Sequence, residues 1–308
     1  MNKKLVSWLA SGGLLLTATI WGFSFVVVKD TLDYVGAVYM VAVRYTLAAV
    51  VMSLIFVPRW KHLNKSILIH GLISGFFLLT AYVTQTIGCN FTTAGKNAFL
   101  TTIYVILVPL IGWILYKKRP GWYVFVAAVL SVTGIALLSL GADDASDLNK
   151  GDVLTLICGV FFALHIISTA KFNEQGDDTV LLTLLQFWTV AVFSWIAAPF
   201  FDGKPDFASF TNARVILSIL YLGLLSTMLC FTLQNLGLKY VNSSLASLFL
   251  SFESVFGVLF SMIVLHERLT LKMGIGCALI FLGLTLAETK PGVKTKTGST
   301  HTEGQAQT

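Results

Sequence analysis

Four ionisable side chains lie within long apolar stretches of this 308-residue chain: Arg44, Lys96, His165 and Glu253. If those stretches cross a lipid bilayer, each such group costs at least ~2.5–3.5 kcal/mol at mid-span and needs a partner or a task. These four residues are therefore the first candidates for binding a ligand or carrying a proton.

Glu253 and His165 are predicted to lie deepest. Glu253 is about ten residues into the apolar stretch 243–265, and at 1.5 Å per residue this is ~15 Å, close to the bilayer centre. His165 lies at a similar depth in the stretch 153–170. Either group could carry a proton, and Glu253 could also hold a cationic substrate group. The alternative for each is a hydrogen bond that holds neighbouring helices together.

Arg44 and Lys96 carry the two positive charges inside these stretches. Arg44 is near mid-depth and could hold a carboxylate by a bidentate contact, but we favour a structural pairing for it. Lys96 is shallower, where it could attract an anion or extend to the interface. Asn97, which follows it, is a further candidate for substrate binding.

Polar and aromatic side chains in the same stretches suit the lining of a binding site. Trp21 and Tyr104 could stack on a ring or a cation, although each could equally fill a helix interface. The predicted substrate-binding residues are Trp21, Ser24, Tyr82, Lys96, Asn97, Thr101, Tyr104, His165 and Glu253, with Gln85 and Gln234 as further lining and with Glu253 and His165 as proton-coupling candidates.

The sequence predicts no metal site, no cofactor and no catalytic centre. The four cysteines are far apart and form no CxxC pair, and no His or Cys stands at ligand spacing from His165. Motifs such as HExxH, GxSxG and a nucleotide-binding loop are missing from the sequence. We therefore expect that the chain is not an enzyme, with an intramembrane enzyme kept as an alternative.

The composition indicates a membrane protein. The chain is 56% hydrophobic and only 12% charged, whereas about 25% charged residues is usual in soluble domains. Its net charge of +6 could suggest nucleic acid binding, but the basic residues gather at the ends of apolar stretches and read as topology signals instead. We expect membrane lipids, and no nucleic acid, as partners.

Ten stretches are long and apolar enough to be membrane-spanning helices, for which roughly 20 residues are needed. They are 6–28, 35–57, 67–87, 94–116, 122–140, 153–170, 180–200, 215–235, 243–265 and 271–288. The predicted fold is an all-α membrane protein of ten transmembrane helices. The segment 289–308 is polar, and we expect a disordered cytoplasmic tail.

Basic residues predict that both termini are cytoplasmic, because Lys and Arg concentrate on the inner side of membrane proteins. Such an orientation places these basic residues inside: Lys3, Lys4, Arg59, Lys61, Lys65, Lys117, Lys118, Arg119, Lys171, Lys239, Lys290, Lys294 and Lys296. It leaves fewer outside: Lys29, Lys150, Lys204, Arg214, Arg268 and Lys272.

The chain also repeats itself. Residues 85–140 align without a gap on 234–289, and the match pairs Gln85 with Gln234 and Gly134 with Gly283. Because each copy holds five spans, an odd number, the second copy enters the membrane from the opposite side. The prediction is two inverted five-helix repeats, 1–141 and 152–288, a plan common among secondary transporters.

Short motifs in both halves resemble the EamA family of the drug/metabolite transporter superfamily. Helix 1 carries Trp21-Gly22-Phe23-Ser24-Phe25 followed by Lys29, and helix 2 carries Arg44-Tyr45. The fourth helix carries residues 92–101 (TTAGKNAFLT), and the turn before the last helix carries 265–270 (LHERLT). The sequence departs from the family pattern at Ser254, where proline often follows the glutamate, and at His266, where glycine is usual.

The resemblance implies a central cavity lined by helices 1, 3, 4, 6, 8 and 9. It also implies a transporter in the bacterial inner membrane, most often an exporter of amino acids or related metabolites. We expect a small-molecule substrate, possible proton coupling, and a monomer or homodimer. A scaffold without transport activity is the remaining alternative.

Overall fold

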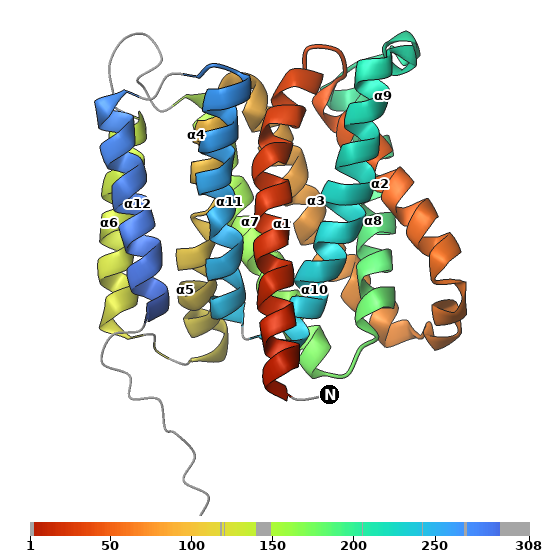
Figure 1. The fold of residues 1–308 in the computed structure, drawn as a ribbon. Coiled ribbons are helices and arrows are strands. Elements are labelled where there is room, and N and C mark those ends of the chain that lie inside the picture. The colour runs from red at the N-terminus through yellow and green to blue at the C-terminus, as the bar shows by residue number, and fades with distance from the viewer. Residues whose placement is uncertain are drawn as a thin grey trace, which may run out of the picture.

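The structure is a computed structural model that describes residues 3–117, 119, 121–139, 149–204, 206–241, 243–267 and 270–289. Within these residues the chain forms α-helices, short 3-10 helices and one π-helical segment, with no strands (Figure 1). The predicted tail, 289–308, and the end of the first predicted repeat, at residue 141, lie outside the described residues except for Thr289.

The helices divide at the connection between residues 139 and 149. The first set comprises α1 (Lys3–Thr31), α2 (Ala37–Ile55), the 3-10 helix η1 (Val57–His62), α3 (Lys65–Phe91), α4 (Ala94–Thr101), α5 (Tyr104–Tyr116) and α6 (Trp122–Ser139). The second set comprises α7 (Lys150–Glu174), α8 (Thr179–Phe201), the 3-10 helix η2 (Phe207–Thr211), α9 (Ala213–Leu220), the π-helix η3 (Tyr221–Leu229), α10 (Cys230–Tyr240), α11 (Ser243–Val264) and α12 (Leu271–Thr289).

Seven helical segments in the described part of the chain are long and apolar enough to cross a membrane. They are α1, α2, α3, α4 with α5, α7, α8, and the continuous run from α9 to α10. Helices α6, α11 and α12 contain shorter apolar segments. The chain is thus a multi-pass membrane protein, and the count of ten spans stays a prediction.

Polar residues set where several helices begin. The Asn64 side chain accepts a hydrogen bond from the Ile67 amide at the start of α3, and Asn149 forms a capping box with Asp152 at the start of α7. These caps lie a few residues outside the apolar stretches. Helices α3 and α7 therefore begin earlier than the spans predicted at 67–87 and 153–170.

Two interruptions break the regular helices. The predicted span 94–116 is divided at Thr102 and Ile103 into α4 and α5, and the run between α9 and α10 widens into η3. Local hydroxyls take part in both, since Thr102 Oγ1 donates to the Phe99 carbonyl and Thr227 Oγ1 to the Leu222 carbonyl. Irregular backbone at membrane depth is tolerated only where protein groups or a cavity surround it, so both positions point to the protein interior.

The two faces of the bundle can be defined by the helix ends. The face where α1 begins and α12 ends is called the terminal face, and the opposite one the distal face (Figure 1). At the distal face, Lys29 Nζ donates to the carbonyls of Cys89 and Thr92, and Thr92 contacts Asp152. Helices α1 and α3 therefore end where α7 begins, and α7 runs opposite to both.

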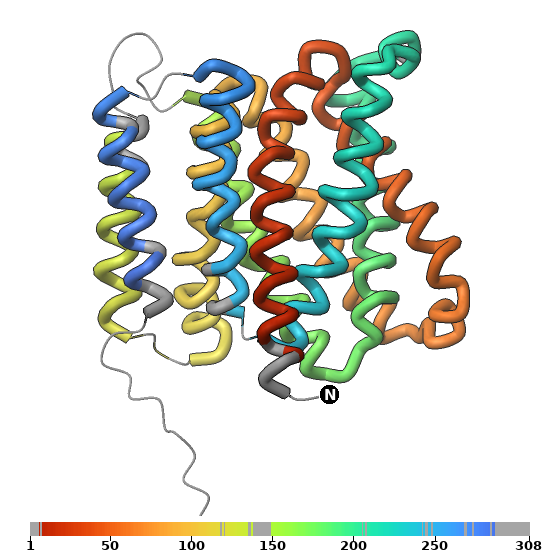
Figure 2. The backbone as a smooth tube through the Cα atoms, viewed as in Figure 1, coloured from red at the N-terminus to blue at the C-terminus, as the bar shows by residue number. Residues whose placement is uncertain are grey.

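The same reversal holds for other helix pairs (Figure 2). Gly36, before α2, lies against Asp202, after α8. Helix α6 packs on α12 along one side of the bundle (Figure 1), where Gly134 lies against the Gly276 carbonyl. Each of these partners is thus antiparallel to its mate.

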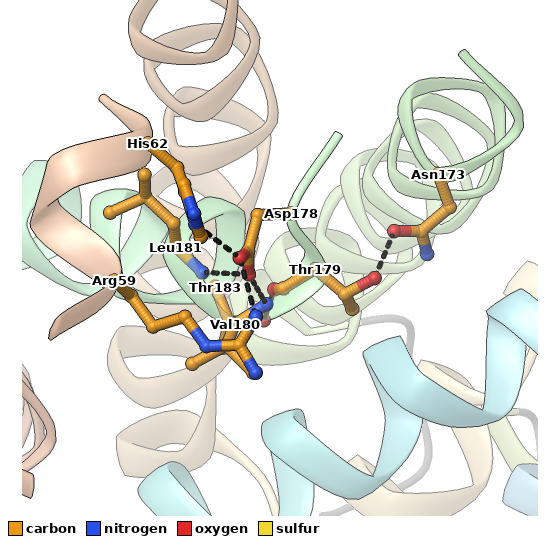
Figure 3. Close-up of polar contacts among 8 residues, drawn as sticks. All are labelled: Arg59, His62, Asn173, Asp178, Thr179, Val180, Leu181 and Thr183. Carbon is orange, nitrogen blue, oxygen red and sulfur yellow. Dashed lines mark hydrogen bonds and ion pairs between the residues drawn. The ribbon is translucent and has the colours of Figure 1, made fainter. Parts of the chain in front are cut away.

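At the terminal face the 3-10 helix η1 is tied to the start of α8. Arg59 Nη1 lies 2.7 Å and His62 Nδ1 3.2 Å from Asp178 Oδ2, and the other oxygen of Asp178 accepts from the Val180 and Leu181 amides (Figure 3). A second link joins His70 to Asp177 at 2.6 Å. These contacts fasten α2 and α3 to the connection between α7 and α8.

The bundle has an aromatic core and an apolar exterior. Tyr45, Tyr82, Phe162, Phe187 and Phe231 pack edge to face or tilted against one another. Many large apolar side chains face outward instead, among them Ile114, Val129, Phe200 and Ile263. An exposed apolar surface of this extent is expected of a protein whose solvent is lipid.

Candidate functional site

A narrow cavity lies inside the bundle, between residues of both helix sets. Its free volume is about 30 Å³, which leaves room for no more than a few water molecules. The lining residues are Trp21, Ser24, Phe25, Val28, Arg44, Tyr82, Gln85, Cys89, Asn97, Tyr104, Phe162, Ile166, Ser226, Gln234 and Glu253. They come from α1 to α5 and from α7, η3, α10 and α11. The predicted helices 1, 3, 4, 6, 8 and 9 correspond to α1, α3, α4 with α5, α7, the run from α9 to α10, and α11. The cavity thus includes one helix, α2, that the resemblance did not imply.

Glu253 and Tyr104 form a hydrogen-bonded pair in the cavity wall. The Tyr104 hydroxyl donates to Glu253 Oε1 at 2.9 Å, and both side chains are almost completely buried. Tyr104 is the first residue of α5, directly after the interruption at Thr102 and Ile103. A hinge in the helix and a buried carboxyl group therefore meet at one point.

Arg44 lines the same cavity and has an exposed fraction of 2%. Its Nε donates to Thr227 Oγ1 at 2.9 Å and its Nη2 to Ser226 Oγ at 3.1 Å, both in η3. The guanidinium carbon lies 4.8 Å from the centre of the Tyr82 ring, a cation–π distance. These polar partners are neutral, which differs from the structural charge pairing favoured by the sequence.

Helix α1 is fastened to η3 by two side chains that were predicted to bind substrate. Trp21 Nε1 donates to the Ser226 carbonyl at 2.7 Å, and Ser24 Oγ donates to Ser226 Oγ at 2.8 Å. Ser226 therefore contacts Trp21, Ser24 and Arg44 together. No sequence pattern singled out this serine, because its partners come from distant helices.

Asn97 has one spare hydrogen-bonding atom in the cavity wall. Its Nδ2 donates to Thr155 Oγ1 at 2.8 Å and to the Gln85 carbonyl at 3.3 Å, whereas its buried Oδ1 has no partner. Thr101 stands behind the lining and accepts a hydrogen bond from Gln85 Nε2. Asn97 thus offers an unused acceptor. Thr101 does not line the cavity but bonds to Gln85, which does.

Lys96, a predicted substrate-binding residue, does not line the cavity. Its Nζ lies 2.6 Å from Asp152 Oδ2, and its side chain is neither at the interface nor open to an anion, with an exposed fraction of 4%. The group formed by Lys29, Thr92, Lys96, Asp152 and Glu267 is called here the distal clamp. Glu267 belongs to it because its carboxylate accepts from the Ala94 and Gly95 amides at the start of α4.

His165 also stands outside the cavity lining. It is fully buried, its Nε2 lies 3.4 Å from Gln186 Oε1, and its Nδ1 has no hydrogen-bond partner. Its ring meets Phe231 edge to face. The prediction of direct substrate contact by His165 is therefore not matched by its position, since Phe162 and Ile166 of the same helix face the cavity instead.

Neutral groups connect the helices near the terminal face. Asn235 Nδ2 donates to Thr183 Oγ1 and to Gln186 Oε1, both at 2.9 Å, and its carbonyl accepts from Asn173. Asn173 also accepts from Thr179 at 2.8 Å (Figure 3). This set of amides and hydroxyls is called the terminal network.

Acidic, histidine and cysteine side chains do not gather into any group of three that could hold a metal ion within the described residues. The four cysteines are free, and Cys89 lines the cavity. The chemistry available at the site is that of a buried carboxyl group, a buried guanidinium and several amides and hydroxyls, which suits binding of a small polar molecule.

Comparison with known proteins adds a family and a fold. The sequence model of the EamA-like transporter family matches residues 8–140 and 149–289. An uncharacterized transporter of Archaeoglobus fulgidus is 33% identical over 283 residues, which cover 89% of this chain and 84% of that protein. The uncharacterized transporter YoaV of Bacillus subtilis is 25% identical over 88% of this chain and 94% of its own. A crystal structure with 19% identity has a TM-score of 0.62 over 88% of this chain and 96% of that chain, a likeness in fold.

Proposed function

This chain belongs to the EamA-like transporter family, and from this premise we propose that it is a secondary transporter that exports a small polar metabolite, such as an amino acid. The observation that carries the proposal is the central cavity, because a guanidinium, that of Arg44, and a carboxyl group, that of Glu253, line it at membrane depth. Buried charges are expensive in lipid and mark substrate or ion pathways.

Alternating access is often built on two related halves, and we propose ten spans arranged as two inverted repeats. The repeat offset of 149 residues separates Tyr104 from Glu253, which touch. The same offset relates 127 to 276 and 134 to 283. Gly134 lies against the Gly276 carbonyl, and Gly283 lies against the Ala127 carbonyl. Such reciprocal contacts are expected around a two-fold axis.

A second reciprocal contact extends this argument to the first helix of each half. Gly88 lies against Gly151, and Gly237 lies against Leu14. Gly88 and Gly237 differ by 149 positions, whereas Leu14 and Gly151 differ by 137. The first helices therefore pair by a shorter offset than the later ones. The two family matches, 8–140 and 149–289, favour the same division.

The proposed transport cycle starts from a closed state. A cavity of about 30 Å³ is too small for a metabolite, so the helices around it must separate before one can bind. We propose that the distal clamp closes one entrance and the terminal network the other, and that they open in turn. The hinge at Thr102 and Ile103 and the π-helix η3 are the interruptions that permit such bending.

Orientation and coupling complete the proposal. With the terminal face on the cytoplasmic side of the inner membrane, the distribution of basic residues follows the inside-positive rule. Glu253 is the candidate proton carrier, because its hydrogen bond with Tyr104 can be exchanged for one with a substrate or water. Uncoupled movement of substrate is the alternative that the same geometry allows.

Transport into proteoliposomes tests this proposal. We expect the purified protein to move at least one compound from a panel of radiolabelled L-amino acids, and Glu253→Gln to abolish any dependence of the rate on a pH gradient. The matched control is Glu174→Gln at the end of α7, which lies outside the cavity. A wild-type protein that moves no solute, or a Glu253→Gln variant with an unchanged pH dependence, would contradict the proposed roles.

A further inference from the structure

We infer that Arg44 binds a carboxylate group of the transported substrate and thereby selects acids over their amides and esters. This inference rests on the proposed transport function, and it assigns Arg44 a task different from the structural pairing predicted from the sequence.

The first observation is that the guanidinium has donors to spare inside the cavity. Of its five N–H groups, one on Nε bonds to Thr227 and one on Nη2 bonds to Ser226. Nη1 makes no hydrogen bond within the described residues. The guanidinium carbon also lies 4.8 Å from the centre of the Tyr82 ring. The edge formed by Nη1 and Nη2, with its parallel donors, remains for a planar anion.

The second observation concerns charge. The buried cation Lys96 has Asp152 beside it, and the half-buried Lys29 has two backbone carbonyls. Arg44 has no ion pair with any carboxylate in the part of the chain described, and the Glu253 carboxyl bonds to Tyr104 instead. A lone buried cation is costly unless something compensates it, and a bound carboxylate would do so.

The third observation is that acceptors for a positive group lie in the same cavity wall. Asn97 Oδ1 is unpartnered, and only Oε1 of Glu253 is bonded to Tyr104. A ligand with a carboxylate for Arg44 and an ammonium group for Glu253 and Asn97 would satisfy all these groups. A substrate with both charges therefore fits the lining better than a neutral or singly charged one.

Binding at Arg44 would also involve the π-helix η3. The present partners of Arg44, Ser226 and Thr227, both belong to η3, and Ser226 also holds Trp21 and Ser24 of α1. A carboxylate bound at the free edge of the guanidinium would therefore be linked through one side chain to η3, and through Ser226 to α1. Substrate recognition is then coupled to the π-helix.

The test compares acids with their amides in proteoliposomes. Radiolabelled L-amino acids that the wild-type protein takes up are competed with the same unlabelled amino acid and with its α-amide. We expect the amide to compete at least about tenfold less well. Arg44→Gln should lose uptake of the free acid by at least about tenfold and no longer favour it over the amide. Arg44→Lys should fall between, because a lysine keeps the charge without the bidentate edge.

Two controls keep the outcomes distinct. Arg214→Gln removes a surface arginine that pairs with Asp30, and it should leave uptake and the preference for the acid unchanged. If Arg44→Gln elutes as an aggregate, the preference measured for Arg44→Lys decides. Wild-type uptake with an unaltered preference in the Arg44 variants overturns this inference alone, whereas no uptake by the wild type overturns the proposed function and this inference with it.

Discussion

The helices are held together by different chemistry near the distal face and near the terminal face. The distal clamp uses full charges: Lys96 with Asp152, Lys29 with two carbonyl groups, and Glu267 with the start of α4. The terminal network uses amides and hydroxyls centred on Asn235, Asn173 and Gln186. Among the described residues near the terminal face, the ion pairs lie nearer the surface, as in Arg59 with Asp178.

The difference teaches how each end can open. A buried ion pair is strongly destabilising when one partner is left alone, so the distal clamp must open with its charges exchanged or hydrated together. Neutral hydrogen bonds can be replaced one at a time by water, at a net cost of about 1 kcal/mol each. We therefore expect the distal contacts to break together in one cooperative step and the terminal contacts to break one after another.

The largest effect should come from breaking the distal ion pair. Asp152→Asn leaves Lys96 charged in a buried site, and we expect the free energy of unfolding in detergent to fall by about 3–5 kcal/mol. The Lys96→Met, Asp152→Asn double variant should regain most of this loss because no lone charge remains. Thermal unfolding measures both. If Asp152→Asn is as stable as Arg214→Gln, the distal ion pair does not contribute the stability expected here.

A smaller loss is expected from the terminal network. Asn235→Ala removes the donor to Thr183 and Gln186, and an unsatisfied buried amide costs about 1–3 kcal/mol. The same unfolding assay should place this variant between Asp152→Asn and the wild type. An effect equal to that of Asp152→Asn would remove the contrast between the two ends.

The contrast can be sharpened with two glycines that occupy matching positions in the proposed repeats. A Cβ at Gly88, near the distal face, would lie 2.9 Å from the Gly151 carbonyl oxygen, whereas one at Gly237 would meet the flexible end of Leu14 at 2.8 Å. Because backbone cannot step aside, we expect Gly88→Ala to cost about 1–3 kcal/mol and Gly237→Ala less. Equal losses in thermal unfolding would contradict this reasoning.

The smallest effect concerns Asp178 at the terminal surface. Burial alone would raise the pKa of its carboxyl group, but hydrogen bonds from Arg59, the Leu181 amide and His62 outweigh burial and hold that pKa below its usual range. Its stabilising contribution is thus present above about pH 4, its unfolded pKa, and is lost as the pH falls through the lowered value.

The Asp178 contribution can be isolated by substitution. Asp178→Asn should show less loss of thermal stability than the wild type when detergent-solubilised protein is taken from pH 5 to pH 3. The difference should stay below about 1 kcal/mol, because Arg59 is half-exposed. If the thermal stability of the two proteins falls in parallel from pH 5 to pH 3, Asp178 makes no such contribution.

The sequence predicted the helices well because apolar length is a local property. The family assignment was confirmed, and the helix ends differ by a few residues where caps such as Asn64 extend them. The break between α4 and α5 and the π-helix η3 were not predicted. Local hydroxyl groups take part in both. The π-helix η3 also has partners in α1 and α2, and its own sequence does not reveal them.

The candidate site shows the same division. Trp21, Ser24, Tyr82, Tyr104 and Glu253 reach the cavity, as depth and polarity favoured. Lys96 and His165 do not, because depth along a helix does not determine the direction in which a side chain points. Asp152, the partner of Lys96, was overlooked because it follows Asn149 in a capping box at the start of a helix, where an acidic residue is unremarkable.

The contact between Tyr104 and Glu253 has a consequence for how such a protein can arise. Under the proposed symmetry, Tyr104 and Glu253 occupy the same position in the ancestral five-helix unit. In a dimer of two identical units, this residue would contact its own copy on the two-fold axis. Two glutamates there would repel and two tyrosines would lack the acid. An acid bonded to a hydroxyl on that axis is available only after the copies have diverged, so a fusion of two identical first halves should fold without gaining this pair.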